Sequence, residues 1–135
     1  MTRHSRLLRI AGALSATIAV TYVCTAFAGL TATYPVTIDM TNRTATGSAG
    51  SARNSGDNFQ YLYCGLVANT TTVEARCYAQ NATQVNTFCT SLSSSIVSTI
   101  RTMSSDSYVN FKWDTSNHCT QVQVMTGSQA APKAP

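Results

Sequence analysis

Acidic, basic and phosphate-binding side chains are scarce in this chain, and three of them form the strongest catalytic candidate. Glu74 and Arg76 occupy alternate positions of one predicted strand and therefore share a face. A carboxylate base, a phosphate-binding guanidinium and the imidazole of His118 as an acid would suit phosphodiester cleavage by a small secreted ribonuclease. However, alternation on any solvated strand gives the same pair, and His118 falls in TSNH, a predicted turn where polar residues are usual. We therefore assign no catalytic residue and rank the ribonuclease last among the alternatives.

Other catalytic and metal-binding patterns are missing from the sequence. No G-x-S-x-G pattern marks one of the many serines as a nucleophile. The four cysteines after residue 28 contain no C-x-x-C pair, so a structural zinc site is not expected. A thiol nucleophile is not expected either, because all four cysteines are predicted to form disulfides. We predict no metal and no cofactor, and we lean against an enzyme.

Aromatic side chains indicate binding instead. Tyr61, Tyr63 and Tyr78 are predicted to share one face of a hairpin, and Trp113 would join them if a second hairpin lay alongside. Such rings can stack against sugars or pack against a partner protein. The same stripe is also typical of a core floor that another segment covers, and the N-terminal strand would be that cover. We take these four residues as the candidate binding face, with an unknown protein or carbohydrate as ligand.

The first 28 residues have the form of a secretory signal peptide. MTRHSRLLR is basic, an apolar run follows from Ile10, and Ala26-Phe27-Ala28 suits a signal peptidase. An uncleaved membrane anchor is the alternative, against which the Ala-x-Ala exit argues. Cleavage after Ala28 would leave six Lys and Arg against five Asp and Glu, a net charge of +1. We predict a secreted protein, periplasmic or extracellular, without a nucleic-acid partner or membrane contact after cleavage.

Four cysteines remain after the predicted cleavage site, and an even number in an oxidising compartment predicts two disulfides. Each would stabilise a chain of this size by about 2–4 kcal/mol. We favour Cys77–Cys89, which would tie a strand to a helix, and Cys64–Cys119, which would tie two hairpins together. The other two pairings stay open, including Cys64–Cys77 across the first hairpin.

Two hairpins follow from runs of alternating aromatic and β-branched residues. The first joins residues 58–69 to 71–80, and the second joins residues 107–114 to 119–126. A turn centred at residues 70 and 71 would pair Leu62 with Ala79, Cys64 with Cys77, and Leu66 with Ala75. Between the hairpins, residues 83–103 place apolar side chains at spacings of three and four. This spacing predicts an amphipathic helix with Asn81 as its cap.

The N-terminal segment 30–41 alternates apolar and polar residues, which predicts a strand, and Pro35 confines it to a sheet edge. Residues 42–57 are rich in Gly, Ser, Asn and Ala without hydrophobic periodicity, which predicts a loop or linker. The strand therefore has two destinations. We expect it to fold back on its own domain, and the alternative is donation to the sheet of a neighbouring copy.

Together these elements predict an α+β fold, with an antiparallel sheet of about five strands packed on one helix. The predicted organisation is a signal peptide at 1–28, an edge strand and linker at 29–57, a disulfide-stapled core at 58–127 and a mobile tail at 128–135. We expect a small exported, non-catalytic binding or structural protein of the cell envelope or extracellular space. The alternatives are a surface-fibre subunit that self-associates through residues 30–41, a secreted hydrolase inhibitor and the ribonuclease. Asn-x-Thr glycosylation sequons begin at Asn42, Asn69 and Asn81.

Overall fold

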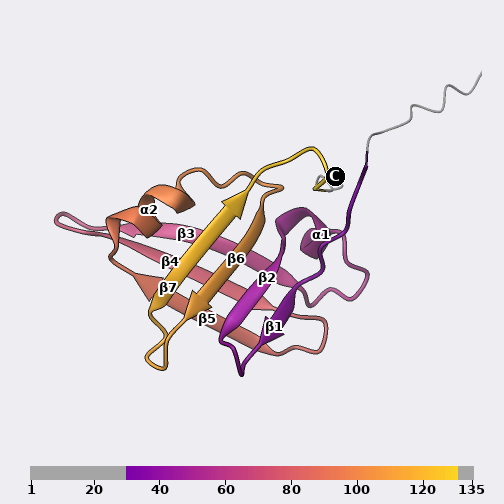
Figure 1. Cartoon of the computed structure of the whole chain (residues 1–135), viewed down its shortest axis with the longest axis horizontal. Helices are drawn as coiled ribbons and strands as arrows, with labels where there is room; N and C mark the ends of the chain where they lie inside the picture. Colours follow the sequence, from indigo (N-terminus) through magenta and orange to yellow (C-terminus); the bar gives the residue numbers. More distant parts are fainter. Residues whose placement is uncertain (1–29, 131–135) are drawn as a thin grey trace, which may run out of the picture.

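Alternating apolar residues build two antiparallel sheets, one lying across the other, with a short helix at either end (Figure 1). The computed structural model describes residues 30–130, so the predicted signal peptide and residues 131–135 lie outside the described residues. The fold is α+β, as predicted, although seven strands form two sheets instead of about five forming one. The four-stranded sheet has the order β1 (Thr37–Asp39), β2 (Thr44–Ser48), β6 (Tyr108–Trp113) and β7 (Cys119–Met125). The three-stranded sheet has the order β3 (Tyr61–Ala68), β4 (Val73–Gln80) and β5 (Asn86–Ser91), and the helices are α1 (Ala49–Arg53) and α2 (Ser94–Ile100).

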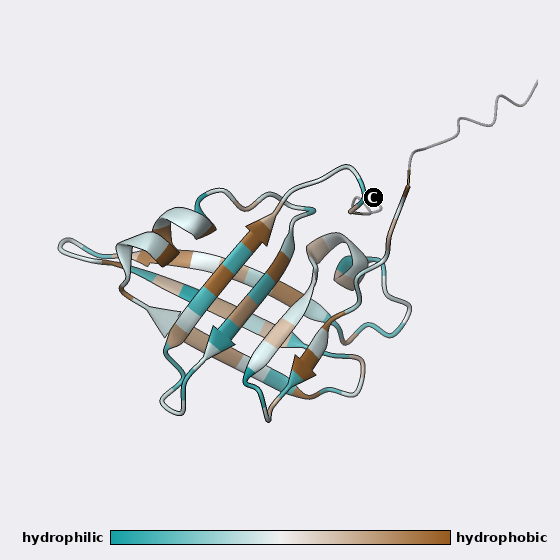
Figure 2. Ribbon diagram, viewed as in Figure 1, coloured by the Kyte–Doolittle hydropathy of each residue, from teal (hydrophilic) through white to brown (hydrophobic). Residues whose placement is uncertain are grey.

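Both predicted hairpins are present. In β3–β4 the register pairs Leu62 with Ala79, Cys64 with Cys77, and Leu66 with Ala75, as the predicted turn requires. The turn forms because the Asn69 side-chain oxygen accepts hydrogen bonds from two backbone amides that follow it. In β6–β7, hydrophobic and hydrophilic residues alternate along the strands (Figure 2), and a bulge follows Lys112.

The helix predicted over residues 83–103 is wrong for its first half, because residues 86–91 form β5 and only residues 94–100 form α2. In β5, Thr87 and Cys89 are buried while Phe88 is exposed, so the period is two. The run is rich in Ser and Thr, which are poor helix formers, and pairing with β4 satisfies its backbone. Asn81 therefore caps a β-turn, where its side-chain oxygen accepts from the amides of Thr83 and Val85.

The loop or linker predicted over residues 42–57 is also wrong. This segment contributes β2, which pairs with both β1 and β6, and helix α1. Its small residues are buried because neighbours approach closely: a Cβ on Gly47 would lie 3.1 Å from the Cα of Val36. Ser48 caps α1 by accepting a hydrogen bond of 3.1 Å from the amide of Ser51. Ala, Gly and Ser can thus form a core layer without any large apolar residue to reveal it.

The N-terminal segment contacts its own domain, although its regular strand is shorter than residues 30–41. Only Thr37–Asp39 pair with β2, whereas Leu30 is 83% exposed. Ahead of β1, the amide of Ala32 donates to the Gln129 carbonyl at 2.8 Å. Gln129 belongs to the tail that was predicted to be mobile, so residues 128–130 are held against the N-terminal segment.

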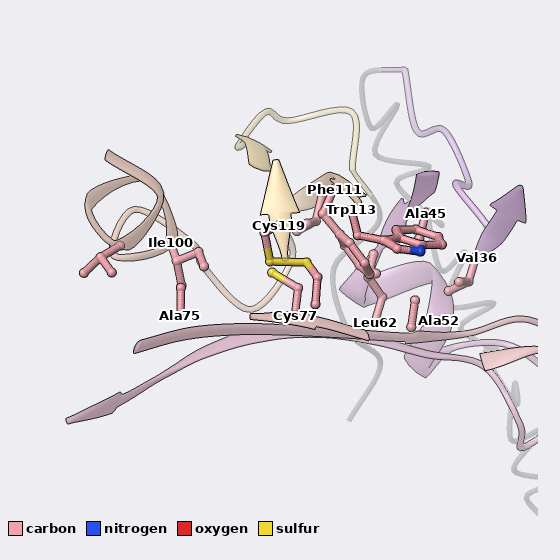
Figure 3. Close-up of a cluster of buried hydrophobic side chains, with 14 residues drawn as sticks. Val36, Ala45, Ala52, Leu62, Ala75, Cys77, Ile100, Phe111, Trp113 and Cys119 are labelled. Atoms are coloured by element: carbon pink, nitrogen blue, oxygen red, sulfur yellow. A yellow bond between two sulfur atoms is a disulfide. The ribbon is translucent and has the colours of Figure 1, made fainter. Parts of the chain in front are cut away.

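The core lies between the two sheets and under α2. Figure 3 shows the core side chains on one side of the three-stranded sheet, with Ile100 of α2 above Ala75 of β4. Phe111 on β6 is completely buried, and it lies on the inner face of the four-stranded sheet. The opposite face of the three-stranded sheet therefore carries the residues that alternate with the core positions.

The two disulfides are Cys64–Cys77 and Cys89–Cys119, so the favoured pairing was wrong. It was wrong because Cys89 is on a strand: Cys64, Cys77 and Cys89 lie in one row across β3, β4 and β5. Cys89 then reaches the other sheet at Cys119. Two disulfides indicate an oxidising compartment. Neither helix within residues 30–130 has the length and apolarity that crossing a membrane requires.

Candidate functional site

Four aromatic side chains gather on the outer face of the three-stranded sheet, and we call them the aromatic row. Tyr63 lies directly opposite Tyr78, and Tyr78 lies directly opposite Phe88. Tyr61 lies two positions before Tyr63 on β3 and completes the group. Their exposed fractions are about two-fifths to one-half for three of the rings: Tyr61, Tyr63 and Phe88. This is the largest group of exposed rings in the described chain, and the rings touch one another.

The rings of the aromatic row stand face to face across the strands. Tyr63 and Tyr78 have centroids 5.0 Å apart and planes inclined by 21°. Tyr78 and Phe88 have centroids 5.9 Å apart and planes inclined by 23°. Nearly parallel rings cannot lie side by side in one plane at such separations, because carbon atoms in contact must stay about 3.5–4.0 Å apart. The stack therefore presents ring edges outward, and an open ring face only at its ends.

The electrostatics of the aromatic row favour the neutral form of the Tyr63 hydroxyl. The pKa of Tyr63 is raised above its ordinary value, first by partial burial and then by repulsion from Tyr78 and Tyr61. The Tyr63 hydroxyl therefore stays protonated at any physiological pH and can both donate and accept a hydrogen bond.

The structure places three of the four predicted binding residues together and moves the fourth away. Trp113 is only 6% exposed and lies in the core beside Phe111, with ring centroids 5.7 Å apart. Its strand β6 lies in the other sheet and its ring packs in the core, so the predicted face lacks it. Phe88 takes its place in the row. Sequence reasoning missed Phe88 because residues 83–103 were assigned to a helix, although the alternation of Thr87, Phe88 and Cys89 was visible.

Glu74 and Arg76, the pair named for the ribonuclease alternative, lie beside the aromatic row. The Arg76 Nη2 and Nε atoms lie 2.6 and 2.7 Å from Oε2 of Glu74. This ion pair raises the pKa of Arg76, and Tyr78 adds to the effect. Arg76 is flanked in register by Gly65 on β3 and Thr90 on β5. No atom lies within 4 Å of the point where a Gly65 side chain would begin, so the sheet surface is open there.

His118, the third residue named for the ribonuclease alternative, continues the row of paired backbone positions that runs from Gly65 through Arg76 to Thr90. Its backbone forms a bridge with Thr90, whose amide donates to the Asn117 carbonyl at 3.0 Å. Two inter-strand steps of about 4.8 Å place the His118 backbone roughly 10 Å from that of Arg76. The His118 imidazole instead contacts Asp114, with 3.3 Å between Nδ1 and Oδ2. The Glu74 and Arg76 side chains thus pair with each other, and the His118 imidazole contacts Asp114 instead of either of them.

A hollow of about 320 Å³ lies between the N-terminal segment and α1. Asp57 on its wall accepts hydrogen bonds from the amides of Phe59 and Gln60, from the Gln60 side chain and from the Ser55 hydroxyl. These bonds stabilise the carboxylate and lower the pKa of Asp57 to about 2. The Asp57 carboxylate therefore holds the loop that leads into β3 in place. Within residues 30–130, no three potential metal ligands cluster together.

No protein family model, curated protein or solved structure matches this chain.

Proposed function

We propose that this chain is a small exported, non-catalytic binding protein of the cell envelope or extracellular space, and that the aromatic row is its recognition surface. The observation that supports the proposal is a set of touching, exposed rings on a sheet face that no described segment covers. Exposed apolar patches rimmed by polar groups are typical of interaction sites. Here Arg76, Glu74 and Gln80 supply the polar rim.

Two features of the chain support an exported protein. The signal-like residues 1–28 direct export, and the two disulfides suit an oxidising compartment. With the signal removed, the near-neutral charge favours neither nucleic acid nor an anionic surface as the ligand.

A polypeptide fits the aromatic row better than a flat sugar ring. Sugars stack on open aromatic faces, whereas here the faces of Tyr63 and Tyr78 are largely turned toward each other. Ring edges and hydroxyls suit apolar side chains and backbone carbonyls, which is why tyrosine is enriched in protein interfaces. The ion pair of Glu74 and Arg76 offers further hydrogen bonds at the margin.

A peptide-display selection on the immobilised mature protein tests this proposal, alongside a panel of soluble polysaccharides. We expect selected peptides to lose at least about tenfold in affinity, or 1.4 kcal/mol, when Tyr63→Ser and Phe88→Ser are combined. The matched control combines Gln121→Ser and Gln123→Ser on exposed positions of β7, in the other sheet. Peptides that bind all three proteins equally would refute the recognition surface. Polysaccharides bound in place of peptides, with loss in the double variant, would refute the ligand class.

Donation of residues 30–41 to a neighbour is less well supported. It would require Ala32, Val36 and β1 to leave their partners in the same chain. The hydrolase inhibitor is a special case of polypeptide binding, and the ribonuclease has a separate test below.

A further inference from the structure

We propose that β3 is a self-association strand: two copies of this chain pair β3 against β3 in antiparallel fashion, about a two-fold axis at Cys64. The two three-stranded sheets would then form one six-stranded sheet. This inference goes beyond the recognition surface, because its partner is a second copy and its contact is a strand edge.

The edge of β3 offers unpaired backbone groups. β4 pairs with β3 on one side, and no strand of residues 30–130 pairs with it on the other. The Cα atoms of Cys64 and Cys77 lie only 4.0 Å apart, which identifies this pair as one that exchanges no backbone hydrogen bonds. The N–H and C=O groups of Cys64, and of Leu62 and Leu66 in the same phase, therefore point toward the free edge. No hydrogen bond within the described chain uses them.

The sequence of β3 lacks the features that usually block such an edge. YLYCGLVA is eight residues long and contains no charge and no proline. Natural edge strands are commonly short, charged, bulged or covered. Two other edges of the described sheets follow that rule: β1 has three residues, and β5 is bridged by His118.

A two-fold axis at Cys64 gives a self-complementary register. Leu62 would pair with Leu66 of the second copy, and the exposed Tyr61 would pair with the exposed Val67. Tyr63 would lie opposite Gly65 of the second copy, in a closely spaced pair without backbone hydrogen bonds. The open space above Gly65 accepts the ring, which would also lie beside the Arg76 guanidinium of the second copy. The same contacts repeat in reverse, as a two-fold interface requires.

Shifts of this register lose these contacts. An axis at Gly65 would set two glycines against each other and leave the space above them empty. An axis at Tyr63 would pair Leu62 with Cys64 and place Gly65 opposite Tyr61, away from the end of the ring stack. The axis at Cys64 also closes the assembly at two copies, which distinguishes it from a fibre.

Light scattering of the mature protein over a range of concentrations, with disulfides intact, tests the proposal. We expect wild-type protein to reach twice the chain mass. Val67→Lys, at an exposed position of β3, should raise the dimer dissociation constant by at least about tenfold, because a lysine blocks edge pairing. Gln123→Lys on β7 is the control and should leave the dimer intact. A wild-type protein that stays monomeric at millimolar concentration would overturn the proposal, as would a dimer that tolerates Val67→Lys.

Cross-linking tests the register separately. Tyr61→Cys combined with Val67→Cys should give a covalent dimer on mild air oxidation, because the two positions oppose each other across the axis. Either single substitution should give no covalent dimer, since each position lies far from the same position in the second copy. A cross-link in the single variants, or none in the double variant, would overturn the register. Tyr63 belongs to both surfaces, whereas Phe88 lies on β5, away from the β3 edge. Phe88→Ser alone should therefore weaken peptide binding without changing the dimer, and the two proposals fail independently.

Discussion

Tyr63 and Tyr78 stack across β3 and β4, with ring centroids 5.0 Å apart and planes inclined by 21°. The two residues are directly opposed in the register of the hairpin. The pair lies on the face that points away from the core. The geometry of the two rings is therefore set by their contact with each other and by the strands beneath them. It is therefore both a local stabilising contact and the centre of the proposed recognition surface.

A double-mutant cycle measures that contact. Tyr63→Ala and Tyr78→Ala should show a coupling energy of about 0.5–1.5 kcal/mol, the usual range for aromatic pairs. The measurement is urea unfolding of the two single variants and the double variant at one protein concentration. The control cycle combines Tyr61→Ala with Phe88→Ala, whose rings are not in contact, and should show coupling near zero. Equal coupling in both cycles would contradict a specific stack.

The two disulfides differ in what they connect, and their removal should differ accordingly. Cys64–Cys77 closes 13 residues within one hairpin, whereas Cys89–Cys119 closes 30 residues and joins the two sheets. The chain-entropy relation gives about 2.9 kcal/mol for the shorter loop and about 3.6 kcal/mol for the longer one. We expect the paired serine variant of Cys89 and Cys119 to lose more unfolding free energy in urea. A larger loss of unfolding free energy in the Cys64 and Cys77 variant would contradict the expectation that the disulfide between the sheets stabilises the fold more.

Truncation of one buried and one exposed phenylalanine should distinguish the core face of the sheets from the outer face. Phe111 is completely buried, so Phe111→Ala should cost about 3–5 kcal/mol of unfolding free energy. Phe88 is 43% exposed on the outer face, so Phe88→Ala should cost distinctly less. Thermal or urea unfolding of the two variants compares the cost of the same Phe→Ala change on the two faces. Similar losses would indicate that the outer face is covered.

Much of this arrangement follows from side-chain alternation, and the exceptions have physical reasons. The β3–β4 register is predictable because Asn69 and the residues after it make a turn whose position fixes every pair. β5 was obscured because apolar residues at 85, 88, 89, 92 and 96 satisfy helical spacing as well as strand spacing. β2 was obscured because Ala45 and Gly47 bury well without being strongly hydrophobic.

The candidate site was predictable only in part for the same reason. Tyr61, Tyr63 and Tyr78 belong to one hairpin, so local register places them on one face. Phe88 and Trp113 depend on which sheet their strands join, and that choice is made by tertiary packing. The disulfide partner of Cys89 depends on the same choice.

Asp57 should give the protein an acid-dependent component of stability. Its folded pKa of about 2 lies below the ordinary value of 3.8, so the folded state favours the ionised form. The stabilisation is complete above about pH 4 and is lost as the pH falls toward 2. Gln60→Ala removes the largest cause and should move the pKa of Asp57, followed by carbon-detected NMR, back toward 3.8. Asp57→Asn should flatten the loss of stability between pH 4 and pH 2. An unchanged pKa in Gln60→Ala would contradict this explanation.

Arg76, Thr90 and His118 lie in one row of paired backbone positions, which gives the ribonuclease alternative a direct test. Catalysis would require Glu74 to leave Arg76, or His118 to leave Asp114, because each of these side chains already has an immediate partner. We therefore expect the purified mature protein to release no more acid-soluble nucleotide from RNA than its His118→Ala variant does. Because His118 is an exposed turn residue, the variant should fold normally, which circular dichroism can check. Release by the wild-type protein that disappears in both His118→Ala and Arg76→Ala would assign hydrolysis to this face and displace the non-catalytic proposal.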